Sequence, residues 1–226
     1  MTGNGVAGDA PKRQSLRERQ KEMTRQLLLD GARTAFDSGR YTDVTIDEIA
    51  SVAGTSRATF YLYFTKAEAL FELLREGFHD VESSLGHRAL GTIADAVTYQ
   101  QLRRYLGHHV NGWQKYRSLA GAWMEGDGSD PEVRQMTDKR IAQSVHDLAE
   151  VVTAQRRLKR LPVTPEDARA RAAVMDIQLQ YVSYYLTVRD LPLDLDAVVD
   201  QLAQQWYCAL FSTVTATGEV SVDEPE

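Results

Sequence analysis

Cysteine is almost absent from this chain of 226 residues, which holds only Cys208. A single cysteine excludes an intrachain disulfide framework and a zinc site built on cysteine pairs, so a disulfide can form only between two chains. Long apolar runs are absent too, because nowhere do 18 apolar residues follow one another and the N-terminus lacks the apolar core of a signal peptide. We therefore expect a cytoplasmic protein without a membrane span.

The chain also lacks an excess of positive charge, since its formal net charge is -6. Nucleic-acid binding depends, however, on where the basic residues lie. Residues 12–66 hold ten Lys and Arg against seven Asp and Glu, a net charge of +3, so the rest of the chain carries -9. A basic segment near the N-terminus and an acidic remainder suit a molecule that approaches DNA with one end.

Catalytic and metal-binding patterns are missing as well. No nucleophile–base motif, phosphate-cradling glycine loop or paired-carboxylate signature occurs, so we expect neither an enzyme nor a bound cofactor. His108 and His109 are adjacent, and adjacent helical residues point about 100° apart, which makes a shared metal ion difficult. Cys208 lies in an apolar helical stretch, where packing is the simpler role.

Helical periodicity, by contrast, runs through most of the sequence. Residues 1–14 are rich in glycine and predict a disordered tail that ends in the basic pair Lys12 and Arg13. Apolar residues three and four positions apart predict a first helix over 16–38, with Gly39 as a left-handed C-terminal cap.

Two short helices follow, with a glycine between them. Thr45 and Glu48 have the spacing of a capping box, and the helix that they predict ends at Gly54. The Thr-Ser pair after this glycine can cap another short helix over about 57–63.

The rest of the sequence predicts longer helices and no convincing strand. A second capping box at Thr65 and Glu68 predicts a helix of about twenty residues. Further helices are expected around 97–113, over 118–125, from Pro131 to about 159, from Pro165 and over about 195–216. We thus expect an all-α fold of about nine helices, divided into a basic tail (1–14), a helix-turn-helix domain (15–64), an effector-binding and dimerisation domain (65–217) and an acidic tail (218–226).

The two short helices have the helix-turn-helix pattern, in which the second helix lies in the major groove of DNA. We expect this helix to expose four side chains and to bury three others, namely Ser56, Arg57, Thr59 and Tyr61 against Ala58, Phe60 and Phe64. Arg57 can pair bidentately with a guanine edge, and Thr59 can meet a base edge or a thymine methyl. The hydroxyls of Tyr61 and Thr45 are better interpreted as phosphate contacts.

Plain packing of two short amphipathic helices is the alternative interpretation of this pattern. Tyr61 and Tyr63 argue against it, because Phe60 and Phe64 already fill the core of a small three-helix unit. The role of the basic residues at the front remains open between phosphate or minor-groove contacts and a solvated helix end, since glutamates lie among them. These residues are Lys12, Arg13, Arg17, Arg19 and Lys21.

The stretch TIDEIASVAGTSRATFYLYFTKAEALFELL, residues 45–74, closely resembles the DNA-binding signature of the TetR family of regulators. The resemblance implies a homodimer with an N-terminal DNA-binding domain of three helices and a larger domain that binds a small effector and dimerises through its last two helices. The residues that we expect at the DNA are Thr45, Thr55, Ser56, Arg57, Thr59, Tyr61, Tyr63 and Lys66.

Two positions depart from the family pattern. The family usually has an aliphatic residue after the turn glycine, where this chain has Thr55. It also usually places a phosphate-contacting lysine directly before the glutamate of the next capping box, whereas Ala67 stands there in this chain and Lys66 precedes it. We expect Lys66 to substitute for that lysine with altered geometry.

The larger domain is rich in aromatic and sulfur side chains. Each of them taken alone fits a packed core, but as a group they favour an apolar pocket between helices, with His109 and Gln178 as candidate polar anchors. The predicted ligand is small and apolar or aromatic. The predicted lining residues are Phe78, Tyr105, His109, Trp113, Tyr116, Trp123, Met124, Met136, Gln178, Tyr181 and Tyr185.

Apolar residues cover much of the last two predicted helices and indicate a partner surface. They are Ala172, Met175, Leu179, Val182 and Leu186 on one helix, and Leu195, Val199, Leu202, Trp206, Leu210 and Val214 on the other. Two such helices from each subunit can form a four-helix interface about a two-fold axis. The recognition helices then lie roughly 34–36 Å apart, which predicts a palindromic operator.

These expectations combine into a repressor that a ligand releases from DNA, with the helix after Thr65 as transmitter and Phe78 beside the pocket. A ligand that binds better when the two DNA-binding units are too far apart must weaken DNA binding, because coupling between sites is reciprocal. One alternative is the same architecture controlled by a protein partner or by no effector. Another is an α-helical enzyme or carrier with no role at DNA.

Overall fold

A computed structural model of the chain describes residues 15–85, 90, 95–214 and 220–222, without the side chains of 78–85, 214 and 220–222. Over these residues the chain folds into nine α-helices and one two-stranded ribbon. The predicted all-α class is therefore confirmed. The predicted tail 1–14 and most of the predicted tail 218–226 lie outside the described residues. None of the described helices is long and apolar enough to cross a membrane.

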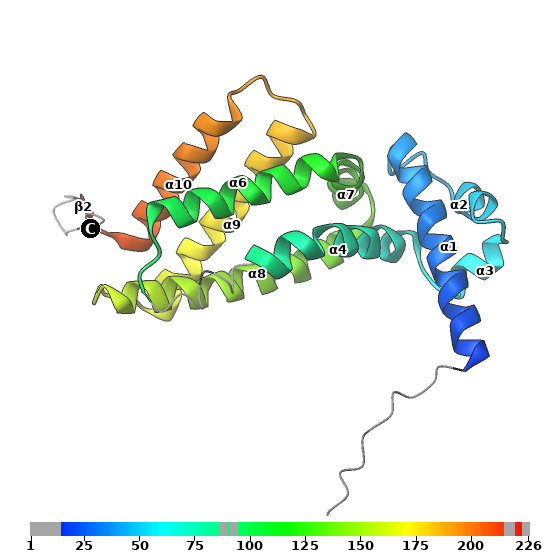
Figure 1. Ribbon diagram of the computed structural model, residues 1–226, viewed down its shortest axis with the longest axis horizontal. Coiled ribbons are helices and arrows are strands. Elements are labelled where there is room, and N and C mark those ends of the chain that lie inside the picture. Colours follow the sequence, from blue (N-terminus) through cyan, green and yellow to red (C-terminus); the bar gives the residue numbers. More distant parts are fainter. Residues whose placement is uncertain (1–14, 86–89, 91–94, 215–219, 223–226) are drawn as a thin grey trace, which may run out of the picture.

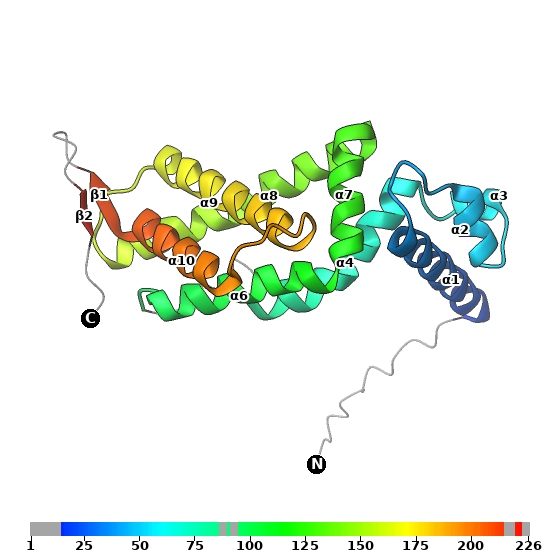
Figure 2. The ribbon, with the colours of Figure 1, turned by 90° about the horizontal axis from the view of Figure 1, so that it is seen from above.

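The first three helices form a compact unit at one end of the molecule. They are α1 (Leu16–Ser38), α2 (Ile46–Val52) and α3 (Arg57–Tyr61). We call residues 15–64 the head and the described residues from 65 onward the body. Figure 1 and Figure 2 show the head at one end and the C-terminal strands at the other.

The body begins with α4, which leads away from the head. Its helices are α4 (Lys66–Leu85), α6 (Tyr99–Lys115), α7 (Arg117–Ser129), α8 (Pro131–Leu158), α9 (Pro165–Thr187) and α10 (Leu195–Phe211). The chain then forms β1 (Ser212–Val214) and β2 (Val220–Val222), which pair antiparallel with Thr213 opposite Ser221. In Figure 2, α7 stands across the molecule between the head and the rest of the body.

Side-chain caps fix where several helices begin. At the start of α1, the Ser15 hydroxyl accepts from the Glu18 N–H at 3.2 Å and the Glu18 carboxylate accepts from the Ser15 N–H at 2.7 Å. This reciprocal pair satisfies two backbone donors that the first turn of a helix leaves open. Asp130 caps α8 and Pro131 follows as its first residue, as the sequence predicts.

Two predicted helix ends and one predicted cap conformation are wrong. α1 ends at Ser38 and Gly39 is its C-terminal cap, as predicted, but Gly39 is extended, with φ of -133°, and not left-handed. α7 continues through Gly126 to Ser129, since no proline interrupts it before Pro131. α10 ends at Phe211 instead of about 216, and the residues that follow pair as strands, which suits the β-branched Thr and Val among them.

The buried side chains form two cores. One lies inside the body between α6, α8, α9 and α10, with Trp206 fully buried in it. The other joins head and body, because Phe36, Phe60 and Phe64 belong to the same cluster as Leu119 and Trp123 of α7. The head therefore packs directly against the body and is not only tethered to it by α4.

Within the head, α1 and α2 cross very closely at Gly31. A Cβ atom added at Gly31 would lie 2.8 Å from the Ile49 carbonyl oxygen and 3.1 Å from the Ala53 Cβ. Only glycine permits this approach, which brings α2 against α1 and so sets the base on which α3 is mounted.

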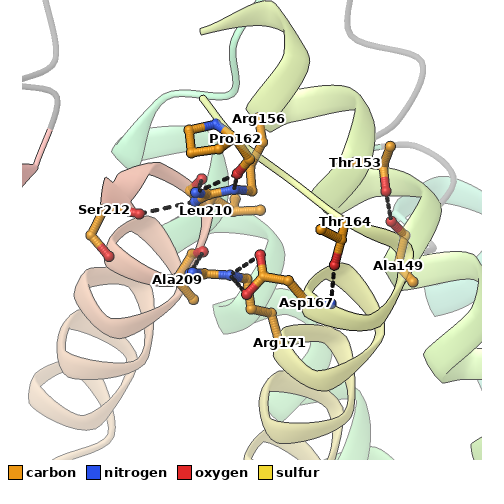
Figure 3. A network of polar contacts seen from close by, with 10 residues as sticks. All are labelled: Ala149, Thr153, Arg156, Pro162, Thr164, Asp167, Arg171, Ala209, Leu210 and Ser212. Carbon is orange, nitrogen blue, oxygen red and sulfur yellow. Dashed lines mark hydrogen bonds and ion pairs between the residues drawn. The ribbon is translucent and has the colours of Figure 1, made fainter. Parts of the chain in front are cut away.

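A buried arginine ties the end of α8 to the end of α10 (Figure 3). Arg156 is 2% exposed, and its Nη1 donates to the carbonyl oxygens of Leu210 and Ser212, both at 3.0 Å. Its Nε and Nη2 donate to the carbonyl oxygen of Pro162 at 3.1 and 2.9 Å. Because the last carbonyls of a helix have no partner within it, Arg156 supplies the missing donors for α10 and for the turn after α8.

A second arginine in the same view links α9 to α10 (Figure 3). The Nε of Arg171 donates to both oxygens of Asp167 at 3.0 and 2.9 Å, and its Nη1 donates to the Ala209 carbonyl oxygen at 2.7 Å. The two arginines thus hold the far end of the body together through backbone carbonyls.

Candidate nucleic-acid interface

The turn between α2 and α3 has the backbone of a helix-turn-helix. The Thr45 hydroxyl accepts from the Glu48 N–H at 3.2 Å and so caps α2. Gly54 has φ of +65°, the left-handed region that favours glycine, and it turns the chain between the two helices. The Ser56 hydroxyl then accepts from the Thr59 N–H at 3.1 Å and caps α3.

Two phenylalanines hold α3 against the head. Phe60 and Phe64 are buried with their ring centroids 6.2 Å apart, and the guanidinium of Arg25 lies 5.4 Å from the Phe64 centroid. Because these two anchors are four residues apart, they face one side and leave the opposite side of α3 to solvent.

Arg57 is the only basic residue on this outward side of α3, and its guanidinium is held in place. Its Nη1 donates to Asp47 at 3.0 Å, and its Cζ lies 5.6 Å from the centroid of the Tyr61 ring. Both side chains of the ion pair are more than half exposed, so solvent screens the pair and it contributes little stability. The guanidinium can therefore exchange Asp47 for a base or a phosphate at small cost.

The structure differs from the sequence prediction at three positions of α3. Ala58, predicted to be buried, is exposed, and Thr59 is only half-exposed with its hydroxyl 2.9 Å from that of Ser56. Leu62 is 81% exposed and was not among the predicted residues. The helical period counted from the buried Phe60 would have found it, because position 62 lies about 200° around the helix from that anchor.

The remaining predicted DNA residues lie close to this face. Ser56 and Tyr61 are exposed, Tyr61 by 53%, whereas Thr55 and Tyr63 are half-buried. Thr45 lies at the start of α2 and is exposed. Apart from Lys66 and Thr45, the predicted set therefore lies in the α2–α3 turn, in α3 and directly after it.

Lys66 points into the protein, and its geometry contradicts the predicted phosphate contact. Its Nζ donates to the carbonyl oxygens of Tyr41 and of Val44, the latter at 2.5 Å, and lies 4.2 Å from the centroid of the Tyr41 ring. Burial lowers the pKa of Lys66, although the nearby carboxylates of Asp130 and Glu125 act to raise it. The ammonium is therefore engaged with the loop before α2.

The predicted effector residues are divided between the two cores. Tyr105 packs against Trp206 with ring centroids 5.9 Å apart, while Trp123 packs against Phe71 at 5.7 Å. His109, a predicted anchor, accepts at Nε2 from the Trp113 indole N–H at 3.2 Å. Each of these side chains thus has a packing partner. The side chain of Phe78 lies outside the described residues.

Four further predicted effector residues contribute to the interior of the body. Trp113 is buried, and Tyr116, Met124 and Met136 are half-buried. Tyr116 lies so close to α4 that a Cβ atom added at Gly77 would be 2.8 Å from its ring. α4 is therefore tightly packed against the junction of α6 and α7, where Tyr116 meets Gly77.

Tyr181 and Tyr185 lie on the outer surface of α9 and not in an interior. Tyr181 is 53% exposed and Tyr185 45%, and they continue a line that begins at Val174 (69%) and Ile177 (48%). The spacing of three and four residues places all four on one side of the helix. We call these four residues the exposed apolar stripe of α9. The placement of the two tyrosines on this stripe does not support their prediction as pocket residues.

The apolar residues predicted to face a partner point inward instead. Met175 and Leu179 of α9 and Leu202, Trp206 and Leu210 of α10 are buried in the body core. Val214 lies in β1 and not in the helix. The prediction chose the wrong side of both helices because α9 carries apolar residues on its inner and its outer side.

Two open grooves are described, and both run along α9. The first, of about 550 Å³, lies against α8 and is floored by Ile141, Val145 and Ala173. The second, of about 510 Å³, lies against α10 and includes Gln178, a predicted anchor, whose amide donates to the Gln205 side chain. Among the predicted aromatic residues whose side chains the structure describes, none lines either groove.

One group of possible metal ligands lies on the outer side of α8. His146, Asp147 and Glu150 bring one ligand atom each within 4.8 Å of one another, and the His146 Nε2 lies 3.6 Å from Glu150. His146 and Glu150 are exposed, so the pair is equally explained as a solvated ion pair of neighbouring helical turns.

Comparison with known proteins adds independent information. Residues 28–74 match the sequence model of the family described as "Bacterial regulatory proteins, tetR family". The HTH-type transcriptional regulator EthR of Mycolicibacterium smegmatis is 25% identical over 138 residues, which cover 61% of this chain and 63% of that protein. An HTH-type transcriptional regulator of Mycobacterium tuberculosis is 36% identical over 83 residues, 36% of this chain and 39% of that protein.

A solved structure extends the likeness over the body. The transcriptional regulator FadR from Bacillus subtilis, in complex with stearoyl-CoA, has a TM-score of 0.63 and 19% identity to this chain, and the match covers 80% of this chain and 96% of that one. The sequence matches to the curated relatives span less than two thirds of those proteins, whereas the shared fold includes head and body.

Proposed function

We propose that this chain is a transcriptional regulator of the tetR type whose α3 reads operator DNA, because its residues 28–74 match the tetR family model and the regulator EthR is similar to it over 138 residues. The observation that carries the proposal is the outward side of α3, where Arg57 is already oriented by Asp47 and Tyr61 while two buried phenylalanines fix the helix. A fixed helix with an exposed guanidinium at its start is suited to major-groove readout.

We assign distinct roles to the exposed residues. Arg57 contacts a guanine edge, Tyr61 and Thr45 contact phosphates through their hydroxyls, and the exposed Leu62 meets an apolar base edge such as a thymine methyl. The half-buried Thr59 mainly supports the cap of α3. Lys66 has no phosphate role in this proposal.

Retardation of a DNA fragment from upstream of the gene tests the proposal. The unaltered protein should retard the fragment, and Arg57→Ala should weaken binding by a factor of about 10 to 100, since a bidentate base contact contributes about 1–3 kcal/mol of discrimination. Arg157→Ala is the matched control, because Arg157 is an exposed arginine at the far end of the body. Equal binding by the Arg57 and Arg157 variants would refute the readout by α3.

We further propose a homodimer formed through α9 and α10. The exposed apolar stripe of α9, Val174, Ile177, Tyr181 and Tyr185, supports this assignment because contiguous exposed apolar side chains of this size are uncommon on a monomer. In this proposal the two heads of the dimer bind the same DNA duplex, one helical turn apart.

The regulator is proposed to act as a repressor that a small apolar or aromatic ligand releases. Two observations support an apolar ligand: the aromatic side chains of α6 and α7 inside the body, and the long acyl chain of the ligand named in the FadR structure. Stearoyl-CoA is therefore a direct probe. It should raise the melting temperature by mass action and weaken DNA retardation, and no effect on either would contradict an acyl ligand.

A further inference from the structure

Tyr41 lies in the loop between α1 and α2, and residues outside the head contact it on several sides. Its N–H donates to Glu125 Oε2 at 2.9 Å and its hydroxyl donates to Asp130 Oδ2 at 2.6 Å. Lys66 donates to its carbonyl oxygen and covers its ring. Only 3% of Tyr41 is exposed. Every polar group of this residue is therefore engaged by α4, by α7 or by the start of α8.

Glu125 of α7 also holds both neighbours of Tyr41. The guanidinium of Arg40 donates to Glu125 Oε1 at 3.0 and 2.6 Å, and the Thr42 hydroxyl donates to the same atom at 2.9 Å. One carboxylate thus fixes three successive residues of the loop. Gly126 adds close contact, since a Cβ atom there would lie 3.3 Å from the Tyr41 ring.

The charges of this junction fit its contacts. Burial acts to raise the pKa of Asp130, but the hydrogen bonds from the Tyr41 hydroxyl and the Glu132 N–H outweigh it and hold that pKa below its usual value. The pKa of Glu125 is lowered in the same way by Arg40, Thr42 and Tyr41, again against its burial. Both carboxylates are therefore ionised acceptors at neutral pH, which makes their hydrogen bonds stronger than neutral ones.

The junction sits directly before the reading helices. The Nζ of Lys66 also donates to the carbonyl oxygen of Val44, the residue before the Thr45 cap of α2. Four residues lie between Tyr41 and Ile46, the first residue of α2, and two of them, Thr42 and Val44, are held by Glu125 and Lys66. A shift of the corner between α7 and α8 cannot leave α2 and α3 in place without breaking these bonds.

We propose that this junction, the Tyr41 socket formed by Tyr41, Lys66, Glu125, Gly126 and Asp130, sets the orientation of the head on the body. Tyr41 is then a positioning residue for DNA binding, and movement of the α7–α8 corner reaches α3 through it as well as through α4. The statement that the head binds DNA rests on the proposed function. The statement that the socket holds the head on the body does not.

Variants at Asp130 separate the socket from the helix cap. Asn and Ser both cap helices well, so Asp130→Asn and Asp130→Ser preserve the start of α8. Asn can keep the cap through its Oδ1 and reach Tyr41 with its amide, which donates to the Tyr41 hydroxyl oxygen, whereas Ser is too short to reach it. Tyr41→Phe removes the same hydrogen bond from the other side. Glu76→Gln is the matched control, since its ion pair with Arg33 at 3.7 Å joins α1 to α4 outside the socket.

The first measurement is the distance between head and body by pulsed electron paramagnetic resonance. Spin labels are placed at Ser51→Cys on α2 and Lys139→Cys on α8, both exposed, in a Cys208→Ser background diluted with unlabelled chains. Asp130→Asn and Glu76→Gln should keep one narrow distance distribution. Asp130→Ser, Tyr41→Phe and Glu125→Ala should broaden it at least twofold or add a second distance.

The double variant Tyr41→Phe with Asp130→Ser should broaden the distribution no more than either change alone, because both remove one bond. Unchanged distributions in folded Asp130→Ser, Tyr41→Phe and Glu125→Ala proteins would overturn the proposal. An equally broadened distance distribution in Glu76→Gln would also overturn the proposal.

The second measurement is affinity for the upstream DNA fragment. Where the unaltered protein retards it, Tyr41→Phe and Asp130→Ser should bind at least fivefold more weakly, and Asp130→Asn within twofold of the unaltered protein. No retardation by the unaltered protein would count against the proposed function alone, since the distance measurement decides the socket without DNA. Unweakened binding in variants with broadened distances would refute the positioning role.

Discussion

Arg156 shows how one side chain can close several open ends of a fold. Its guanidinium donates to three backbone carbonyls at the end of α10, in β1 and in the turn after α8. All of these acceptors are backbone carbonyl oxygens, so the hydrogen bonds of Arg156 satisfy the main chain and do not pair its charge with a carboxylate.

Replacement of this arginine is predicted to destabilise the body. Arg156→Met keeps much of the side-chain length but leaves buried carbonyl oxygens without a donor, so the free energy of unfolding in urea should fall by about 3 kcal/mol. Arg157→Met, at the exposed neighbouring position, should change it by less than about 0.5 kcal/mol. Similar losses in both variants would show that the contacts of Arg156 add no stability.

The contacts of some single residues could be predicted from the sequence, and those of others could not. Arg57, Ser56 and Tyr61 could be placed because they follow from the period of α3 and its two phenylalanine anchors. The orientation of Lys66 could not, because its acceptors are backbone carbonyls 22 and 25 residues earlier, and no side-chain pattern marks a carbonyl. The two carboxylates that accept from Tyr41, those of Glu125 and Asp130, lie more than 80 residues away in the chain.

At the scale of elements, the head depends on the close crossing of α1 and α2. Helix propensity alone favours alanine over glycine at Gly31 by about 1 kcal/mol. The close crossing disfavours alanine, because the added methyl group would meet the Ile49 carbonyl oxygen, a backbone atom that cannot easily move aside.

Gly31→Ala is therefore predicted to lower the free energy of unfolding by about 1–3 kcal/mol, as overpacking usually does. Gly128→Ala is the matched control, since it lies in α7 with no atom within 4 Å of an added Cβ and should be neutral or stabilising. Thermal and urea unfolding of the two variants measure this difference. A stabilised Gly31→Ala protein would mean that α2 can move away from α1 at no cost.

The limits of most helices were predictable because caps and prolines mark them locally. α1, α4, α8 and α9 begin at predicted residues, each after a polar cap or at a proline. The end of α10 was not predictable in this way, since its strand residues become stable only by pairing with a segment several residues further on. The sequence showed no strand there because three-residue strands carry too little alternation to be detected.

At the scale of the whole molecule, the outer side of α9 is predicted to carry the dimer. Ile177→Arg places a charge in the middle of the exposed apolar stripe and should shift the protein from dimer to monomer in sedimentation velocity, with unchanged helical content because the residue is half-exposed in the subunit. Leu158→Arg, at an exposed leucine on α8, should leave the dimer intact. A dimer that survives Ile177→Arg would place the interface elsewhere.

The central claim is that a dimer of this chain holds DNA by two α3 helices. Hydroxyl-radical footprinting on the upstream fragment tests it most directly, because it maps which backbone segments are covered. The account predicts two protected half-sites related by a two-fold axis and separated by roughly 34–36 Å, one turn of DNA, with protection lost in Arg57→Ala. Protection of a single unsymmetrical site, or a footprint that Arg57→Ala leaves unchanged, would contradict it.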